Sequence, residues 1–349
     1  MKVAAATGAY RARARPVAPL PAAAIARYSA VLPAARTEPM PLSLRPLLPA
    51  LLCASLAHAE PMKLADYLAL NGPAPTATLA YGKAPSQFAE LFRPAGAGPF
   101  PVAVLVHGGC WTSQYGGITQ LRNLAGALSA QGIAVWNVEY RRVDEPGGGY
   151  PGTYQDLNAA LDLLGQQATA QQLDLGRMVA VGHSAGGQLV QWLAGRSRIA
   201  PTSPLFQPTV VPVRQIISLG GLADLRHEQA LIKSSCERDL VELTGLPSAA
   251  RPDVFSDTNA AELIPNGSHT VLITGQLDTV SPPRVAHDYA ARARAAGDSA
   301  EVLILPGASH YDEVAASSPA FALVLPAIRA ALGMAAAAAP APVSPPHNK

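Results

Sequence analysis

The sequence is poor in charged residues: only 14% of its 349 residues are Asp, Glu, Lys or Arg, and the net charge is +2. It contains no basic run with interleaved aromatic residues and no nucleic-acid-binding motif. A chain with so weak an overall field is not expected to bind nucleic acid or an acidic membrane surface. Hydrophobic residues make up 49% of the chain, although many of these are alanine.

Cysteine is also scarce, with Cys53, Cys110 and Cys236 as its only occurrences. No C-x-x-C spacing is present and the eight histidines do not cluster along the chain, so no metal site is expected. If Cys53 is removed with a leader segment, Cys110 and Cys236 remain. In an oxidising compartment such a pair permits a disulfide without requiring one.

Long apolar runs are absent, and the longest candidate lies near the N-terminus. Residues 40–60 read MPLSLRPLLPALLCASLAHAE, with a basic Arg45, an apolar stretch from Leu47 to Leu56 and Ala57-His58-Ala59 before Glu60. The stretch is shorter than the roughly 20 residues that span a bilayer. An A-x-A ending instead predicts a signal peptide over residues 40–59.

We therefore expect a periplasmic or secreted protein without stable membrane insertion. An isolated core helix is the alternative interpretation of residues 40–59. Residues 1–39 are rich in Ala, Arg and Pro. We expect translation to start at Met40 and residues 1–39 to be a non-native extension, with a long Arg-rich leader as the alternative.

Between residues 60 and 334 the sequence alternates between apolar, β-branched runs and helical periods, which predicts one α/β domain. The runs are continuous, as is typical of parallel strands covered on both faces. Predicted strands are 101–109, 132–141, 177–184, 215–221, 270–278 and 300–307, and predicted helices are 118–131, 153–167, the run after Ser184, 282–297 and 318–333. This pattern gives a mostly parallel, doubly wound sheet with helices on both faces.

Four segments fall outside this alternation. Residues 76–82 and 88–95 are weaker strands that we expect to form an antiparallel entry hairpin. Residues 222–265 contain no clear strand, and we interpret them as a cap insertion above the carboxyl ends of the strands, where ligands bind in such sheets. The Ala/Pro-rich residues 335–349 are expected to be a disordered tail.

For helix 318–333 we expect Ser318 to be the N-cap with Pro319 at the first helical position.

A serine between glycines follows a predicted strand and precedes a predicted helix. Gly182-His183-Ser184-Ala185-Gly186 fits the G-x-S-x-G nucleophile elbow in its required context. Side chains at the flanking positions would collide with the neighbouring strand and helix. The turn exposes the Ser184 hydroxyl at a helix N-terminus, where amide N–H groups favour developing negative charge.

A serine nucleophile needs a base, and the elbow architecture predicts the chain order nucleophile, acid, base. Asp278 closes the strand TVLITGQLD, and His310 follows the last strand in LPGASHYDE. We expect His310 to take the proton of Ser184 and Asp278 to fix the tautomer of His310. No cofactor-binding residue is expected, because the glycines at 147–149 lack a phosphate-binding motif.

Other residues near these positions receive lesser roles. Asp224 follows a strand that comes one strand too early for the acid in the expected chain order. We interpret it as a supporting or cap residue. Asp312 is expected to cap the following helix. His183 is expected to pack against neighbouring loops and not to act as the base, and Trp111 to pack in the core.

The segment VHGGCW, residues 106–111, supplies the expected oxyanion hole. Its glycines allow the backbone to approach a substrate carbonyl closely. The N–H groups of Gly109 and Cys110, with that of Ala185 after the nucleophile, would face the tetrahedral oxygen. One such donor is typically worth roughly 3–4 kcal/mol in the barrier.

With these motifs the chain resembles α/β-hydrolase-fold enzymes over about residues 76–334. It is most similar to the branch with kynurenine formamidases, feruloyl-esterase-like hydrolases and hormone-sensitive-lipase-like carboxylesterases. The formamidase motif HGGxW is matched by residues 107–111, and in that family the residues matching Gly109 and Cys110 supply oxyanion N–H groups. The third glycine of the lipase motif HGGG is Cys110 here.

This resemblance implies acyl transfer to water through an acyl-serine intermediate, with no cofactor. We expect a serine hydrolase acting on a small carboxylic ester or an arylformamide. A peptidase of the prolyl-oligopeptidase type is the first alternative, although that family normally carries a large N-terminal domain. A non-catalytic binding protein on the hydrolase fold is the second. The sequence leaves oligomeric state and acyl-chain preference open.

Overall fold

The structure is a computed structural model that describes residues 60–335. The predicted signal peptide, the extension before it and all but the first residue of the predicted tail lie outside these residues. No helix between residues 60 and 335 is long and apolar enough to cross a membrane.

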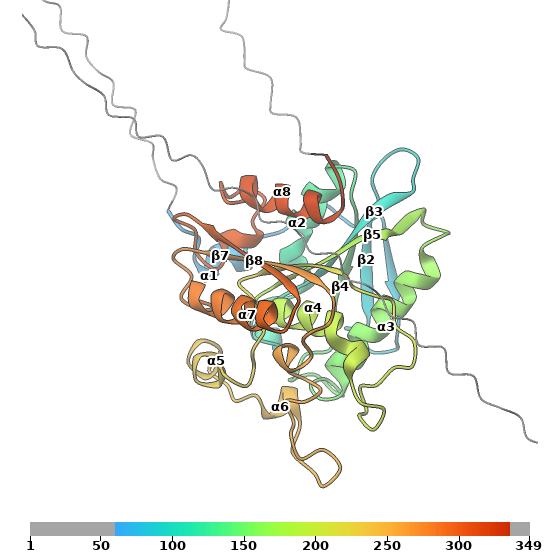
Figure 1. Cartoon of the computed structure of the whole chain (residues 1–349). Helices are drawn as coiled ribbons and strands as arrows, with labels where there is room; N and C mark the ends of the chain where they lie inside the picture. Colours follow the sequence, from blue (N-terminus) through green and yellow to red (C-terminus); the bar gives the residue numbers. More distant parts are fainter. Residues whose placement is uncertain (1–59, 336–349) are drawn as a thin grey trace, which may run out of the picture. The chain divides into compact units, whose positions relative to one another are not determined.

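An eight-stranded sheet with the order β1-β2-β4-β3-β5-β6-β7-β8 forms the centre of the domain (Figure 1). Strands β3 to β8 pair in parallel, while β2 pairs antiparallel with both β1 and β4. The predicted entry hairpin and mostly parallel sheet are thus confirmed. The strands are β1 (Ala77–Ala80), β2 (Phe88–Phe92), β3 (Phe100–Val106), β4 (Ala134–Val138), β5 (Leu173–His183), β6 (Gln215–Leu219), β7 (His269–Gly275) and β8 (Ser299–Leu305).

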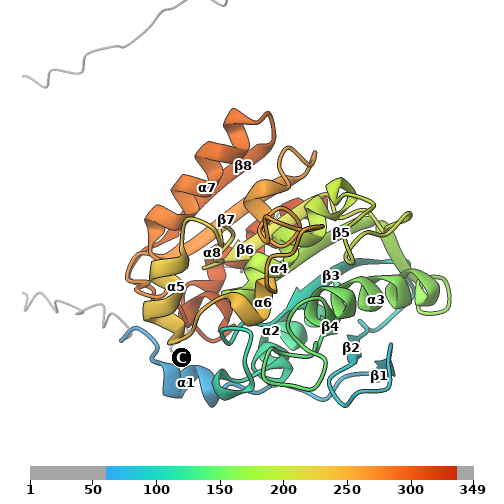
Figure 2. The same ribbon diagram turned by 90° about the horizontal axis from the view of Figure 1, so that it is seen from below.

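Helices cover both faces of the sheet, and Figure 2 shows the same arrangement after a quarter turn. They are α1 (Leu64–Leu68), α2 (Ile118–Ala130), α3 (Gly152–Gln167), α4 (Ala185–Gly195), α5 (Gln229–Cys236), α6 (Val241–Thr244), α7 (Pro283–Ala295) and α8 (Phe321–Ala331). Short 3-10 turns are η1 (Ser113–Tyr115), η2 (Arg196–Arg198), η3 (Ala260–Glu262) and η4 (Asp312–Val314).

The alternation of side chains along the strands divides the core into two layers. On β3, Val102, Val104 and Val106 pack with residues of α3, α4 and α7, whereas Ala103 and Leu105 pack with residues of α2 and α8. Because both faces are covered, every residue of β3 and β4 is buried. This explains the continuous apolar runs seen in the sequence.

Several element boundaries differ from the sequence-based expectation. The predicted strands 101–109, 132–141 and 270–278 end three residues earlier, at Val106, Val138 and Gly275, and two elements begin at other residues than predicted. Strand β5 begins at Leu173, ahead of the predicted residue 177. The last helix begins at Phe321, with Ala320 and not Ser318 as its N-cap. The hydroxyl of Ser318 donates instead to Asp312 Oδ1 at 2.8 Å, which holds the chain in a turn before the helix starts.

Candidate active site

The turn between β5 and α4 holds Ser184 in a left-handed backbone conformation, with φ 54° and ψ −118°. A Cβ at Gly186 would meet the backbone oxygens of Val106 and His107, and one at Gly182 would meet the backbone of Gly186. Only glycine therefore fits on either side of the elbow, as the sequence predicted. A non-glycine residue held at positive φ carries strain that commonly marks a functional position.

Asp278 and His310 meet across two loops that follow neighbouring strands. His310 Nδ1 donates to Asp278 Oδ2 at 2.7 Å, and both side chains are buried. Asp278 Oδ1 accepts the backbone N–H groups of Val280 and Ser281 at 2.7 and 2.8 Å. These donors orient the carboxylate, and the carboxylate selects the tautomer of His310 that leaves Nε2 free to accept a proton.

Ser184, His310, Gly109 and Cys110 all line one cavity of about 180 Å³. The hydrogen bonds that His310 makes within residues 60–335 go to Asp278 and His183, and the Ser184 hydroxyl is not among its partners. Such contacts are often loose in a ligand-free enzyme and tighten when substrate binds. The rest of the wall is formed by Leu64, Tyr67, Tyr115, His183, Ser235, Val280 and Tyr311.

Larger hollows occur elsewhere, but they do not contain these groups. Two of about 390 and 450 Å³ both include Gln215, at the amino end of β6, and neither is lined by a predicted site residue. The site therefore lies where open α/β sheets bind their ligands, at the carboxyl ends of the strands.

The loop after β3 lines the cavity with Gly109 and Cys110 and carries unpaired backbone donors. Gly109, Cys110 and Trp111 all have positive φ, at 100°, 52° and 57°. Within residues 60–335, the N–H groups of Gly109 and Cys110 donate to no backbone or side-chain acceptor. Ala185 is the first residue of α4, so its N–H has no partner within the helix. The three predicted oxyanion donors are thus unpaired.

A buried pair of side chains anchors the start of this loop, residues 107–113, which is the predicted oxyanion loop. His107 Nε2 lies 2.7 Å from Glu139 Oε1, and both residues are buried. Tyr140 stacks on the His107 ring and donates its hydroxyl to the His107 carbonyl at 2.9 Å. Burial alone would raise the pKa of Glu139, but the facing His107, Arg142 and the Tyr140 N–H outweigh it and lower that pKa.

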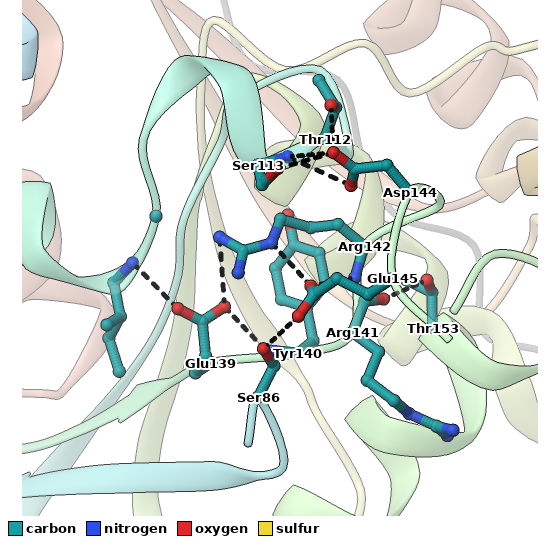
Figure 3. A network of polar contacts seen from close by, with 12 residues as sticks. Ser86, Thr112, Ser113, Glu139, Tyr140, Arg141, Arg142, Asp144, Glu145 and Thr153 are labelled. Atoms are coloured by element: carbon teal, nitrogen blue, oxygen red, sulfur yellow. Dashed lines mark hydrogen bonds and ion pairs between the residues drawn. The ribbon is translucent and has the colours of Figure 1, made fainter. Parts of the chain in front are cut away.

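The far end of the oxyanion loop is held by the same segment after β4. Asp144 accepts the hydroxyls of Thr112 and Ser113 at 2.9 and 2.6 Å (Figure 3). Arg142 lies between Glu139 and Glu145, with its Nε donating to Glu145 Oε2 at 2.8 Å. Residues 139–145 therefore brace the loop from His107 to Ser113 at both ends.

A disulfide between Cys110 and Cys236 fixes the middle of the same loop. Cys236 is the last residue of α5, within the segment 222–265, which has no named strand. The sequence left this pairing open, and the structure makes it. The same segment also contributes Ser235 to the cavity wall.

The remaining acidic candidates lie outside the Asp278–His310 pair. Asp224 accepts from Asn259 and His227 and pairs with Arg292, which supports the expected structural role. Asp312 does not cap α8, contrary to expectation. It lies in η4 and accepts hydrogen bonds from Ser309, Ser318 and the N–H of Met62. These hydrogen bonds hold the loop that carries His310.

The contacts of His183 support the loop that carries His310 and do not indicate a role as the base. Its Nε2 donates to the backbone oxygen of His310 at 3.0 Å. Burial, followed by the nearby His310, lowers the pKa of His183 well below its ordinary value, so the ring is neutral. Trp111 is buried in the core, as predicted.

Sequence reasoning missed several residues of the site. Glu313 lies buried beside Asp278, and Tyr67, Tyr115 and Tyr311 line the cavity. No motif marks the tyrosines, because they come from segments far apart in the chain.

The fold and the elbow, acid and histidine positions together define an α/β-hydrolase. The BD-FAE family model matches residues 90–292, more than half of the chain, and the chain therefore belongs to that family. This confirms the resemblance stated from the motifs. No match was found among curated proteins.

Solved structures with the same fold include several esterases. Esterase B from Lactobacillus rhamnosis superposes with a TM-score of 0.63 at 20% identity, covering 75% of this chain and 89% of that chain. A carbohydrate esterase from gut microbiota gives 0.62 at 16% identity, covering 75% and 100%. A bacterial heroin esterase gives 0.57 at 24% identity, covering 74% and 82%. At these identities the likeness establishes the fold.

Proposed function

We propose that this protein is a serine hydrolase that cleaves small carboxylic esters through an acyl-serine intermediate. The observation that carries the proposal is one cavity lined by the strained Ser184, the Asp278-bound His310 and the unpaired N–H groups of Gly109 and Cys110. The esterases among the structural neighbours support the same reaction class.

In this mechanism Ser184 Oγ attacks the substrate carbonyl while His310 Nε2 takes its proton. The carbonyl oxygen becomes an oxyanion that accepts the N–H groups of Gly109, Cys110 and Ala185. His310 then donates its proton to the leaving alcohol and the ester bond breaks, leaving an acyl group on Ser184. Attack by a water, again deprotonated by His310, releases the acid and restores Ser184.

We further propose that the protein acts in an oxidising compartment, as a periplasmic or secreted enzyme. The Cys110–Cys236 disulfide supports this location, because disulfides persist outside the reducing cytosol. An arylformamide remains the second substrate class, since its carbonyl would bind the same donors and the HGGxW motif is shared with formamidases.

Labelling with a fluorophosphonate probe tests the nucleophile. We expect wild-type protein to be labelled and Ser184→Ala not to be, because the probe phosphonylates the activated hydroxyl. Ser235→Ala is the matched control, since Ser235 lines the same cavity without belonging to the triad. Equal labelling of Ser184→Ala and wild type would refute the assignment. Turnover of amino-acyl anilides but not p-nitrophenyl esters would instead support a peptidase.

A further inference from the structure

A second carboxyl group, that of Glu313, is buried directly behind the candidate triad. Glu313 lies in η4, three residues after His310, and is 1% exposed. Its Oε1 accepts the backbone N–H of Gly275 at 2.7 Å. Gly275 is the last residue of β7, the strand that leads to Asp278. This contact fastens the His310 loop to the strand that carries the acid.

The other oxygen of Glu313 faces the acid and the histidine. A Cβ placed on Gly220 would meet Glu313 Oε2, His310 Nδ1 at 2.8 Å and Asp278 Oδ2 at 3.0 Å. These three atoms therefore lie around one point, the position that a Cβ on Gly220 would take. Oε2 is buried and has no donor as a partner within residues 60–335.

Two carboxyl oxygens that face each other in a buried site repel each other unless one of them carries a proton. Asp278 is held as the charged member by His310 and by the N–H groups of Val280 and Ser281. Burial, and then the charge of Asp278, raise the pKa of the Glu313 carboxyl well above its ordinary value of 4.5. A proton on Glu313 Oε2 satisfies both groups, as in other carboxyl pairs that share one proton.

A bound cation is the competing explanation, because His183, His310 and Glu313 offer ligand atoms within 4.8 Å of one another. However, His183 Nε2 already donates to the His310 carbonyl, which leaves only its Nδ1 without a partner, and His310 Nδ1 already donates to Asp278. A cation would need the remaining nitrogen of His310, which the proposed mechanism uses as its base. The partners present favour a proton.

We propose that Glu313 is a positioning residue that, as a neutral carboxylic acid, donates its O–H to Asp278 and so holds Asp278 against His310. This inference rests on the proposed serine-hydrolase function. Glu313 keeps its proton throughout and touches neither substrate nor Ser184. The titratable groups that face it are Asp278 after β7, His310 on its own loop and His183 at the end of β5.

Two substitutions of Glu313 separate its hydrogen bond from its charge. Glu313→Gln keeps a donor toward Asp278 and an acceptor for the Gly275 N–H, so we expect kcat close to wild type. Glu313→Ala loses both, and we expect kcat to fall about 10-fold to 100-fold while KM changes little, because His310 is no longer held in place.

The pH profile reports the charge state of Glu313. A neutral Glu313 and a neutral Gln place the same charge beside His310, so the acid limb of kcat/KM should not move in Glu313→Gln. If Glu313 were ionised, removing its negative charge would disfavour protonation of His310 and shift this limb to lower pH. Such a shift, or an unchanged kcat in Glu313→Ala, would overturn the proposal.

Infrared difference spectra provide a readout that does not depend on activity or on the alanine variant folding. Wild type minus Glu313→Gln should show the C=O stretch of a protonated carboxylic acid at neutral pH; its absence would contradict the proposal. Glu90→Gln is the control, because Glu90 is equally buried but paired with Arg122 as a carboxylate. It should show no such band. Failure of the hydrolase function would appear separately, in the labelling of Ser184→Ala.

Discussion

Gly220 sets how closely the acid, the histidine and Glu313 can approach one another. It follows β6 with φ of 52°, and the backbone N–H of Gly220 donates to Ile273 in β7 at 2.8 Å. The residue has no side chain at the point where three functional atoms converge. A methyl group there would occupy the space that the Asp278–His310 hydrogen bond needs.

We therefore expect Gly220→Ala to lower kcat about 100-fold, since displacement of a catalytic group by about 1 Å has that effect. Steady-state kinetics on a p-nitrophenyl ester measure this loss. Gly297→Ala is the control: Gly297 also has positive φ, at 98°, but nothing lies within 4 Å of its would-be Cβ. It should lose about 1–2 kcal/mol of stability from backbone strain and keep its kcat. Equal activity of both variants would mean that Gly220 is only a turn residue.

At the residue scale the sequence indicates the candidate triad better than the residues that surround it. Ser184 is recognisable because its glycines, strand and helix are local, and Asp278 and His310 are recognisable because they come three and five residues after β7 and β8. Glu313 and His107 escape because their roles depend on partners, Asp278 and Glu139, that only the folded chain brings into contact.

At the scale of elements, the oxyanion loop depends on two neighbours that are remote in sequence. Residues 139–145 hold its ends, and α5 holds its middle through the Cys110–Cys236 disulfide, with a sequence separation of 126. Three successive residues of this loop have positive φ. The attachments hold this strained backbone in place where Gly109 and Cys110 line the cavity.

Removing the disulfide should therefore affect catalysis as well as stability. For Cys236→Ser we expect the free energy of unfolding to fall by about 2–4 kcal/mol. We also expect kcat to fall several-fold with little change in KM, because the loop donors act mainly on the transition state. Urea unfolding and steady-state kinetics measure the two effects.

Reduction of the disulfide with dithiothreitol should reproduce both effects in wild type but cause no further change in the variant. Ser235→Ala, in the same helix, is the control. A stability loss at unchanged kcat would limit the disulfide to a structural role.

The predicted strands are all present, although several of their ends and those of the last helix differ from the prediction. Continuous apolar runs locate β3 and β4 because both faces of these strands are buried and leave no polar position in the pattern. The predicted start of α8 is wrong because Ser318, a good N-cap by residue type, donates its hydroxyl to Asp312 in the His310 loop. A tertiary contact thus overrides the local preference.

At the scale of the whole described domain, the cavity is assembled from segments near both ends of residues 60–335. Met62 donates its N–H to Asp312 and accepts the Ser309 hydroxyl at 2.7 Å, so the residues before α1 are tied to the His310 loop. This contact brings Leu64 and Tyr67 of α1 to the cavity. No local pattern could predict it, because the partners are separated by almost the whole domain.

The size of this cavity predicts which acyl groups the enzyme accepts. Its volume of about 180 Å³ lies below the roughly 300–1,000 Å³ of pockets for drug-sized ligands. We expect kcat/KM to be highest for p-nitrophenyl acetate or butyrate and to fall steeply for octanoate. Leu64→Ala removes part of the wall and should move the preference toward longer chains.

Leu68→Ala is the matched control for Leu64→Ala, because Leu68 lies on the same helix but is 40% exposed and does not line the cavity. It should leave the chain-length profile unchanged. A wild-type optimum at octanoate, or the same shift in both variants, would mean that the acyl group binds outside this cavity.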